Sequence, residues 1–169
     1  MSLFSTRRKP VAPGPGQESV WDYPRPPRVE PVTTRLAVVL GGETIAATTR
    51  GYRVLETSHP PNYYFPIEDV APGVLERTGG ASFCEFKGRA HYCTVRGGGR
   101  IEPGAAWGYD QPSTGYEELA GHVAFYASRM DSCLVDGERV TPQPGDFYGG
   151  WITSSVTGPF KGGPGSGGW

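Results

Sequence analysis

Short runs of alternating apolar and polar residues, separated by glycine-rich turns, dominate the chain. Such period-two alternation, with Gly-Gly or Asp-Gly between two runs, is typical of antiparallel β-hairpins. The predicted hairpins join residues 35–40 with 44–49 around Gly41-Gly42, and residues 133–135 with 139–140 around Asp136-Gly137. Two more strands are expected within residues 82–95, and a last one, interrupted by Gly149-Gly150, at residues 147–156.

One segment follows a helical pattern instead. Thr114-Gly-Tyr-Glu117 has the spacing of a capping box, and Leu119, Val123 and Tyr126 then recur at helical spacing. The pattern predicts one short helix near residues 115–127. Because strands and helices do not alternate along the chain, the predicted fold class is mainly β with antiparallel sheets.

Glycine and proline are concentrated toward the two ends of the chain. The 169 residues include 26 glycines and 17 prolines, and the length suits one domain with its own core. Residues 1–28 are predicted to be a flexible, proline-rich arm, although Trp21 and Tyr23 indicate that it docks on the domain. Residues 29–169 are predicted to form a single β-rich domain with a glycine-rich tail from about residue 158.

Charge and cysteine content narrow the function classes. The formal net charge is −1 and no basic stripe occurs, which argues against a nucleic-acid partner. No run of about 18 apolar residues suggests a membrane span, and no secretory signal is evident. Three cysteines, an odd number, are consistent with a reducing cytoplasm. The sequence leaves the oligomeric state open.

Residues 55–70 concentrate polar chemistry on a stiff backbone. This segment holds Glu56, His59, Tyr63 and Tyr64 together with three prolines, which favour extended geometry in the residues before them. Glu56 and His59 are the candidate catalytic acid/base pair. On a straight strand they would face opposite sides, but a bend before Pro60 would bring them together. The alternative is structural: His59 caps a turn, and Glu56 pairs with an arginine such as Arg53 or Arg89.

The predicted hairpin around residues 87–89 carries two cysteines and a histidine. Turns at Gly88-Arg89 or at Lys87-Gly88 both place Cys84, His91 and Cys93 on one face. This face would suit a metal site or a Cys84 thiol with His91 as base; alternatively, both cysteines are small buried apolar residues. Because the Cys-x-x-Cys pairs of structural zinc sites are absent, neither a metal nor another cofactor is predicted.

Aromatic residues supply the remaining candidates for a binding site. Such rings bury large apolar areas and offer polar edges, so they suit a pocket for a flat organic ligand, although some would simply fill the core. The predicted ligand-binding residues are Glu56, His59, Tyr63, Tyr64, Lys87, Tyr92, Trp107, Tyr109 and Trp151.

Several of these residues lie in motifs that resemble a bacterial family, the domain of unknown function 427. The resemblance covers about residues 28–141. It rests on Leu55-Glu-Thr-Ser-His-Pro-Pro-x-Tyr-Tyr-Phe-Pro-x-Glu-Asp-Val70, Cys84-x-Phe-Lys-Gly-x-Ala-x-Tyr92, Ala106-Trp107-x-Tyr109, Leu119-Ala-Gly-x-x-Ala-Phe-Tyr126, Asp131 and Val135-Asp-Gly-Glu138.

The resemblance implies a β-tent-like fold, with antiparallel sheets that meet at an angle, as in the thalidomide-binding domain of cereblon. Zinc often staples that group, but the required Cys-x-x-Cys pairs are missing here. The family is sometimes labelled nucleotidyltransferase-like. That activity needs clustered carboxylates for two metal ions, and the chain has no Asp-x-Asp.

These features favour a protein that binds a small organic ligand in an aromatic-lined cleft between sheets, without chemistry. The alternatives are an enzyme that uses Glu56 and His59 or Cys84 and His91, and a protein-interaction module whose arm or tail docks a partner.

Overall fold

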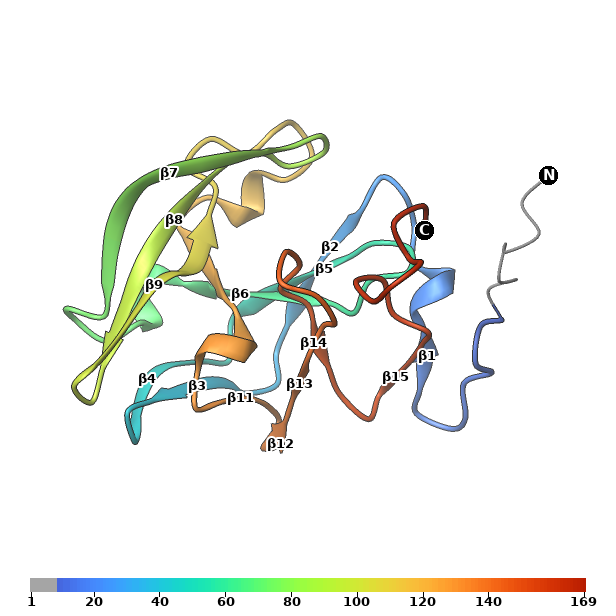
Figure 1. Cartoon of the computed structure of the whole chain (residues 1–169), viewed down its shortest axis with the longest axis horizontal. Helices are drawn as coiled ribbons and strands as arrows, with labels where there is room; N and C mark the ends of the chain where they lie inside the picture. Colours follow the sequence, from blue (N-terminus) through green and yellow to red (C-terminus); the bar gives the residue numbers. More distant parts are fainter. Residues whose placement is uncertain (1–8) are drawn as a thin grey trace.

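The computed structural model describes residues 9–169, and strands make up most of its regular structure (Figure 1). The strands are β1 Glu18–Ser19, β2 Arg28–Val32, β3 Leu36–Leu40, β4 Glu43–Thr48, β5 Gly51–Leu55, β6 Asn62–Pro66, β7 Leu75–Cys84, β8 Gly88–Gly97, β9 Arg100–Gly108, β10 His122–Phe125, β11 Ser132–Val135, β12 Glu138–Arg139, β13 Thr141–Pro142, β14 Trp151–Ile152 and β15 Val156–Thr157. Single 3₁₀ turns occur at η1 Val20–Asp22, η2 Ile67–Asp69, η3 Glu117–Leu119 and η4 Ala127–Arg129.

Two antiparallel sheets form the body of the protein. The larger has the order β2-β5-β6-β10-β9-β8-β7, and the smaller has the order β12-β11-β3-β4. The long strands β7, β8 and β9 run steeply across the direction of β5 and β6 (Figure 1). The predicted mainly β, antiparallel fold class is therefore confirmed.

Local sequence explains the short hairpins. Asp136 and Gly137 adopt φ angles of 49° and 79° between β11 and β12, as a two-residue turn with two left-handed positions requires. Gly41 and Gly42, also with positive φ, connect β3 to β4. The structure therefore confirms these two predicted hairpins.

Alternation along the central strand β6 directs its side chains to two separate cores. Tyr63 and Phe65 point into the main apolar core, to which both sheets contribute. Tyr64 points the opposite way, into a second cluster with Trp107 and Tyr109. Because the larger sheet is buried on both faces here, residues 63–66 of β6 read as one continuous buried run.

The predicted helix at residues 115–127 is wrong. This segment contains one 3₁₀ turn, Glu117–Leu119, and then strand β10, in which Val123 pairs with Phe65 and Gly108. Gly115 and Gly121 have φ angles of 97° and 70°, which an α-helix does not allow. The Glu117 carboxylate accepts a hydrogen bond from the Gly115 N–H and so closes a local turn instead of a helix cap.

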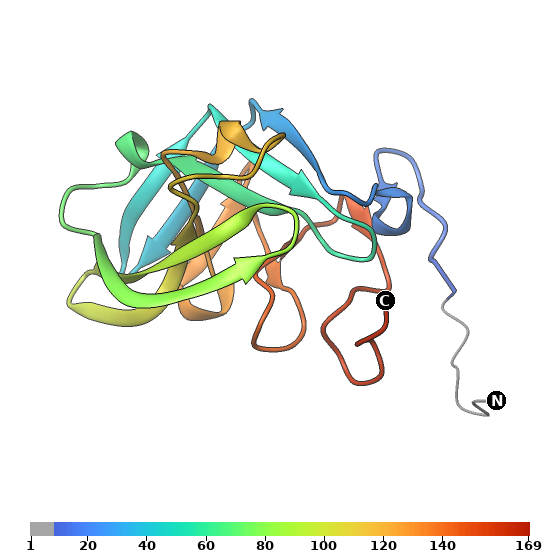
Figure 2. The ribbon, with the colours of Figure 1, turned by 90° about the horizontal axis from the view of Figure 1, so that it is seen from above.

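The single last strand predicted at residues 147–156 is also wrong. Instead, Trp151–Ile152 pairs with β13, and Val156–Thr157 pairs in parallel with β1 of the N-terminal segment. As a result, the N-terminal segment around β1 and the C-terminal segment lie together at the end of the molecule opposite β7–β9 (Figures 1 and 2).

The N-terminal segment contacts the loop that follows β5. The Ser58 N–H donates to the Val20 carbonyl at 3.0 Å, and the Thr57 hydroxyl donates to the Tyr23 carbonyl. The C-terminal segment reaches the same loop, because the Lys161 N–H donates to the Ser58 carbonyl at 2.9 Å. Loop 56–61 is therefore held from both ends of the described chain. Within residues 9–169, no helix has the length and apolar character of a membrane span.

Candidate functional site

A cleft of about 220 Å³ opens on the face of the larger sheet that carries the second apolar cluster. Strands β7–β9 supply one wall, and loop 56–61 with residues 147–149 and 161 supplies the other. Its lining is aromatic with a few charged groups. The lining residues are Glu56, His59, Asn62, Ser82, Phe83, Cys84, Glu85, Phe86, Lys87, Ala90, Tyr92, Trp107, Tyr109, Tyr126, Phe147, Tyr148, Gly149 and Lys161.

The cleft brings together most of the residues predicted from the sequence. Six of them line it: Glu56, His59, Lys87, Tyr92, Trp107 and Tyr109. Tyr64 lies beneath the lining, where its hydroxyl accepts a hydrogen bond from Trp107 Nε1 at 3.3 Å.

Tyr63 and Trp151 lie elsewhere, and their assignment to the same pocket is wrong. Their rings pack against each other in the main core with centroids 5.3 Å apart, and Trp151 Nε1 donates to the Phe125 carbonyl. Tyr63 follows the alternation of β6, which points it away from the face occupied by Tyr64.

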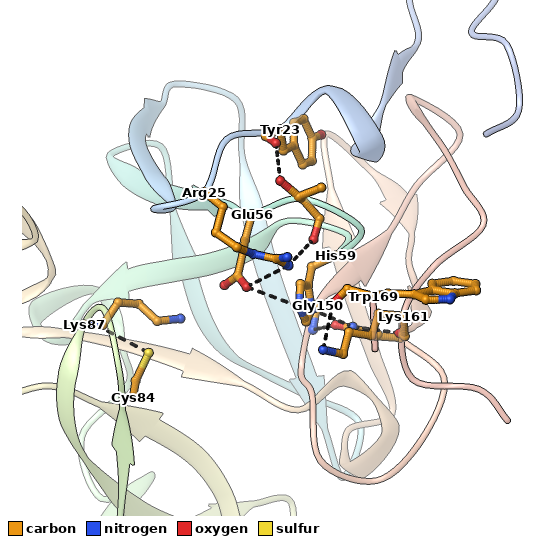
Figure 3. Close-up of polar contacts among 11 residues, drawn as sticks. Tyr23, Arg25, Glu56, His59, Cys84, Lys87, Gly150, Lys161 and Trp169 are labelled. Atoms are coloured by element: carbon orange, nitrogen blue, oxygen red, sulfur yellow. Dashed lines mark hydrogen bonds and ion pairs between the residues drawn. The ribbon is translucent and has the colours of Figure 1, made fainter. Parts of the chain in front are cut away.

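The bend before Pro60 brings Glu56 and His59 together. Ser58 adopts a φ of 72°, and the His59 N–H donates to the Glu56 carbonyl at 3.0 Å, which closes the turn. Glu56 Oε2 then lies 3.5 Å from His59 Nε2 and 3.2 Å from Arg25 Nη2 (Figure 3). The arginine that pairs with Glu56 is therefore Arg25, not Arg53 or Arg89 as the structural alternative had suggested.

Gln143 fixes the protonation of His59. Its Oε1 accepts from the Gly150 N–H, so its Nε2 is the donor that faces the Lys161 carbonyl and His59 Nδ1, at 2.9 and 3.0 Å. Nδ1 of His59 therefore accepts, and the proton of the neutral ring sits on Nε2, facing Glu56. Burial, with the charges of Lys161, Arg25 and Lys87, lowers the pKa of His59 to about 3. The ring is neutral at pH 7, with Nδ1 hydrogen-bonded to Gln143 and Nε2 at 3.5 Å from the Glu56 carboxylate.

Lys87 places a cation on the β7–β8 side of the cleft. Its side chain is only 7% exposed, and its Nζ lies 5.7 Å from the centroid of the Tyr109 ring. The Lys87 backbone N–H contacts Cys84 Sγ at 3.4 Å (Figure 3), which holds the turn between β7 and β8. Burial opposes the charge, but Tyr64, Cys84 and Glu56 outweigh it and raise the pKa of Lys87. The ammonium form is therefore the one that faces the cleft at neutral pH.

The C-terminal wall was missed by sequence reasoning. Tyr148 stacks edge-on against His59 at 4.8 Å, and Lys161 Nζ lies 5.5 Å from the Tyr148 ring centroid. Gly149 packs directly on Trp107, where an added Cβ would overlap the indole ring. The Gly149-Gly150 pair was the available signal, because adjacent glycines often mark a close approach of the backbone to another group.

The predicted cysteine–histidine face does not form. The connection is three residues long, at 85–87, so Cys84 pairs with Gly88 and, in the same register, His91 pairs with Ala81. Cys84 therefore shares a face with Ala90 and Tyr92 in the second cluster, whereas Cys93 lies in the main core. The register separates Cys84 from His91 and Cys93, which removes both the metal set and the Cys84–His91 pair.

Comparison with known proteins gives one family. The sequence model of a family described as a domain of unknown function, DUF427, matches residues 28–136. A comparison with curated proteins finds no match. Within residues 9–169, no group of three or more histidine, cysteine, aspartate or glutamate side chains is placed to hold a metal ion.

Proposed function

The chain belongs to the DUF427 family, and from that premise and the cleft we propose that the protein binds a small organic ligand. One observation carries the proposal. Segments far apart in sequence, around residues 56–62, 82–92, 107–109 and 147–161, converge on one cleft that combines aromatic walls with Glu56 and Lys87. A concave, mostly apolar site with a few polar groups is the usual form of a ligand pocket.

Unsatisfied polarity inside the cleft also supports binding. Asn62 Oδ1 is shielded from solvent and accepts no hydrogen bond within residues 9–169. A buried acceptor without a donor costs about 1–3 kcal/mol. Asn62 lines the cleft, so a rotation of its amide on binding would let Oδ1 accept a ligand N–H or O–H and recover part of that free energy.

The geometry of His59 favours binding over acid/base catalysis. A general base needs a free lone pair within hydrogen-bond reach of the substrate. In His59, Nδ1 accepts from Gln143 and Nε2 faces Glu56. The low pKa makes the ring a weak base as well. The Glu56/His59 pair therefore serves in this proposal as a fixed polar wall.

A thermal-shift screen of metabolites tests the proposal. A ligand that binds only the folded state raises the melting temperature. At a hundredfold excess over Kd, it increases the free energy of unfolding by about 2.7 kcal/mol. We expect at least one flat aromatic compound to raise the melting temperature of the wild-type protein. Native mass spectrometry of the complex would then give its stoichiometry.

Two matched tyrosine variants locate the binding. Tyr92→Ala removes a half-buried ring from the cleft, and Tyr52→Ala removes one from β5 outside it. The ligand-induced shift should fall sharply in Tyr92→Ala and persist in Tyr52→Ala. A screen without any shift, or a shift that survives equally in both variants, would overturn the cleft as the binding site.

A further inference from the structure

We propose, on the premise of the proposed function, that the ligand is a small aromatic carboxylate whose acid group pairs with the ammonium of Lys87. Lys87 lines the aromatic cleft, and one carboxylate, that of Glu56, lies close to it. The surroundings of these two groups determine which charge on a ligand the cleft favours.

Lys87 is a buried cation without a counterion. No ion pair of Lys87 occurs within residues 9–169, although its side chain is only 7% exposed and lines the cleft. Taking an ammonium out of water is costly unless it is paired and hydrogen-bonded. A ligand carboxylate in the cleft would supply both the charge and the acceptors.

The nearby carboxylate is already committed to other partners. Glu56 Oε2 is shared between Arg25 and His59, at 3.2 and 3.5 Å, and the N-terminal segment that carries Arg25 is anchored to the same loop (Figure 3). Glu56 therefore contributes to the field at Lys87 but makes no ion pair with it. This arrangement separates one positive charge from the protein's own acids and directs it at the cleft.

The remaining neighbours of Lys87 are neutral. The Tyr109 ring faces Nζ, and the Tyr64 hydroxyl, which accepts from Trp107, lies on the same side. An ammonium has three N–H donors, and such neutral groups do not use them fully. A carboxylate, with two acceptor oxygens, fits this donor set.

The charged residues that line the cleft favour a ligand with a single negative charge. Glu56 and Glu85 line the cleft together with Lys87 and Lys161, so the lining residues balance at two acidic and two basic groups. A doubly charged phosphate would meet the two carboxylates, whereas a carboxylate needs only Lys87. The volume of about 220 Å³ is below the ~300–1,000 Å³ of pockets for drug-sized ligands, which limits the ligand to one or two rings.

The test uses three probes that share one ring system and differ in charge. They are naphthalene-2-carboxylate, naphthalene-2-carboxamide and naphthalen-2-ylmethylammonium, and their dissociation constants would be measured by calorimetry with the full chain. We expect the carboxylate to bind about tenfold to a hundredfold more tightly than the amide, as a charge-assisted hydrogen bond allows. The ammonium probe should bind most weakly.

Lys87→Met removes the charge but keeps an unbranched apolar chain. In this variant the carboxylate should lose its advantage over the amide. Arg89→Met is the matched control, since it removes one positive charge from an exposed position two residues further along the chain, in β8, that does not line the cleft. Free of probe, Lys87→Met should keep a melting temperature close to that of the wild type, because Lys87 has no ion pair in the described part of the chain to lose.

The outcomes separate the two proposals. Equal binding of all three probes, tightest binding of the ammonium probe, or a carboxylate preference that survives in Lys87→Met would overturn the inference and leave the cleft as a binding site. A large loss of stability in Lys87→Met would also overturn it, since Lys87 would then be a structural residue. No binding of any probe at millimolar concentration, together with an unproductive metabolite screen, would overturn the cleft itself.

Discussion

At the scale of single residues, Gln143 controls the chemistry of the cleft without lining it. Its amide joins three segments: it donates to His59 and to the Lys161 carbonyl, and it accepts from the Gly150 N–H. The side chain is buried, so each of these hydrogen bonds is shielded from water. Gln143 thus sets the tautomer of His59 and ties the C-terminal wall to loop 56–61.

Replacing this amide by an apolar group of similar size should be costly. In Gln143→Leu, the Gly150 N–H and the Lys161 carbonyl lose their partner, and each unsatisfied buried group costs about 1–3 kcal/mol. We expect the free energy of unfolding, measured by urea titration, to fall by roughly 2–4 kcal/mol.

Gln111→Leu provides the control, because Gln111 is exposed. It should change the free energy of unfolding by less than about 0.5 kcal/mol. If the two variants lost the same stability, the Gln143 network would not have the role assigned to it.

At the scale of elements, the segment 143–150 closes the cleft by lying directly on Trp107. Gly149 makes this contact possible, because any Cβ there would overlap the six-membered ring of the indole. The Tyr126 hydroxyl donates to the Phe147 carbonyl at 3.1 Å, and the Tyr126 ring packs 4.6 Å from that of Trp107. The wall is therefore seated on two aromatic side chains.

Gly149→Ala should displace segment 143–150 from its contact with Trp107. The added methyl group forces either the Trp107 ring or the loop to move, and overpacking of this kind costs about 1–3 kcal/mol. We expect that loss in the free energy of unfolding, together with a change in tryptophan fluorescence. Gly163→Ala is the matched control: an added Cβ there meets no atom within 4 Å and the backbone is not left-handed, so stability should stay near that of the wild type.

Elements that local rules determine could be predicted from the sequence. The hairpins at Gly41-Gly42 and Asp136-Gly137 follow from turn residues that accept a positive φ. The helix expected at 115–127 failed because two glycines required positive φ and because tertiary pairing made β10 a central strand. Leu119 and Val123 have helical spacing in the sequence, but they pack in different apolar clusters, on opposite faces of the larger sheet. That sheet is buried on both sides here.

The part of the candidate site that lies within one segment of the chain could be predicted from the sequence. The bend that joins Glu56 to His59 could be proposed from Pro60 alone, and six predicted residues line one cleft. The hairpin register failed because a connection of three residues replaced a two-residue turn, and such a slip changes which residues share a face. Tyr148 and Lys161 were missed because only long-range packing brings the C-terminal segment to the cleft.

At the scale of the whole molecule, His59 couples stability to pH. Its imidazole is enclosed by Glu56, Gln143 and Tyr148, and the cations Lys161, Arg25 and Lys87 oppose a further positive charge. The pKa of about 3 lies below the ordinary value of 6.5. Between these two values the unfolded chain binds more protons than the folded chain, so acidification favours unfolding.

The stability that depends on a neutral His59 is therefore complete above about pH 6.5 and is lost progressively as the pH falls toward 3. A single such group gives a slope of up to about 1.4 kcal/mol per pH unit. Urea unfolding between pH 6.5 and 5 measures this slope above the ordinary range of the carboxylates. We expect the slope to be clearly smaller in His59→Gln, which has no titrating ring at this position.

Comparing the pH slope of His59→Gln with that of the wild type separates the contribution of His59 from those of the other acid-sensitive groups. Burial also lowers the pKa of His91, and ion pairs lower those of Asp69 and Asp110, but these contributions are present in both proteins and cancel in the difference. Identical slopes in the two proteins would mean that His59 accepts a proton in the folded state near its ordinary pKa. The hydrogen bond from Gln143 to Nδ1 would then be absent in solution, and His59 would regain the free nitrogen that a general base requires.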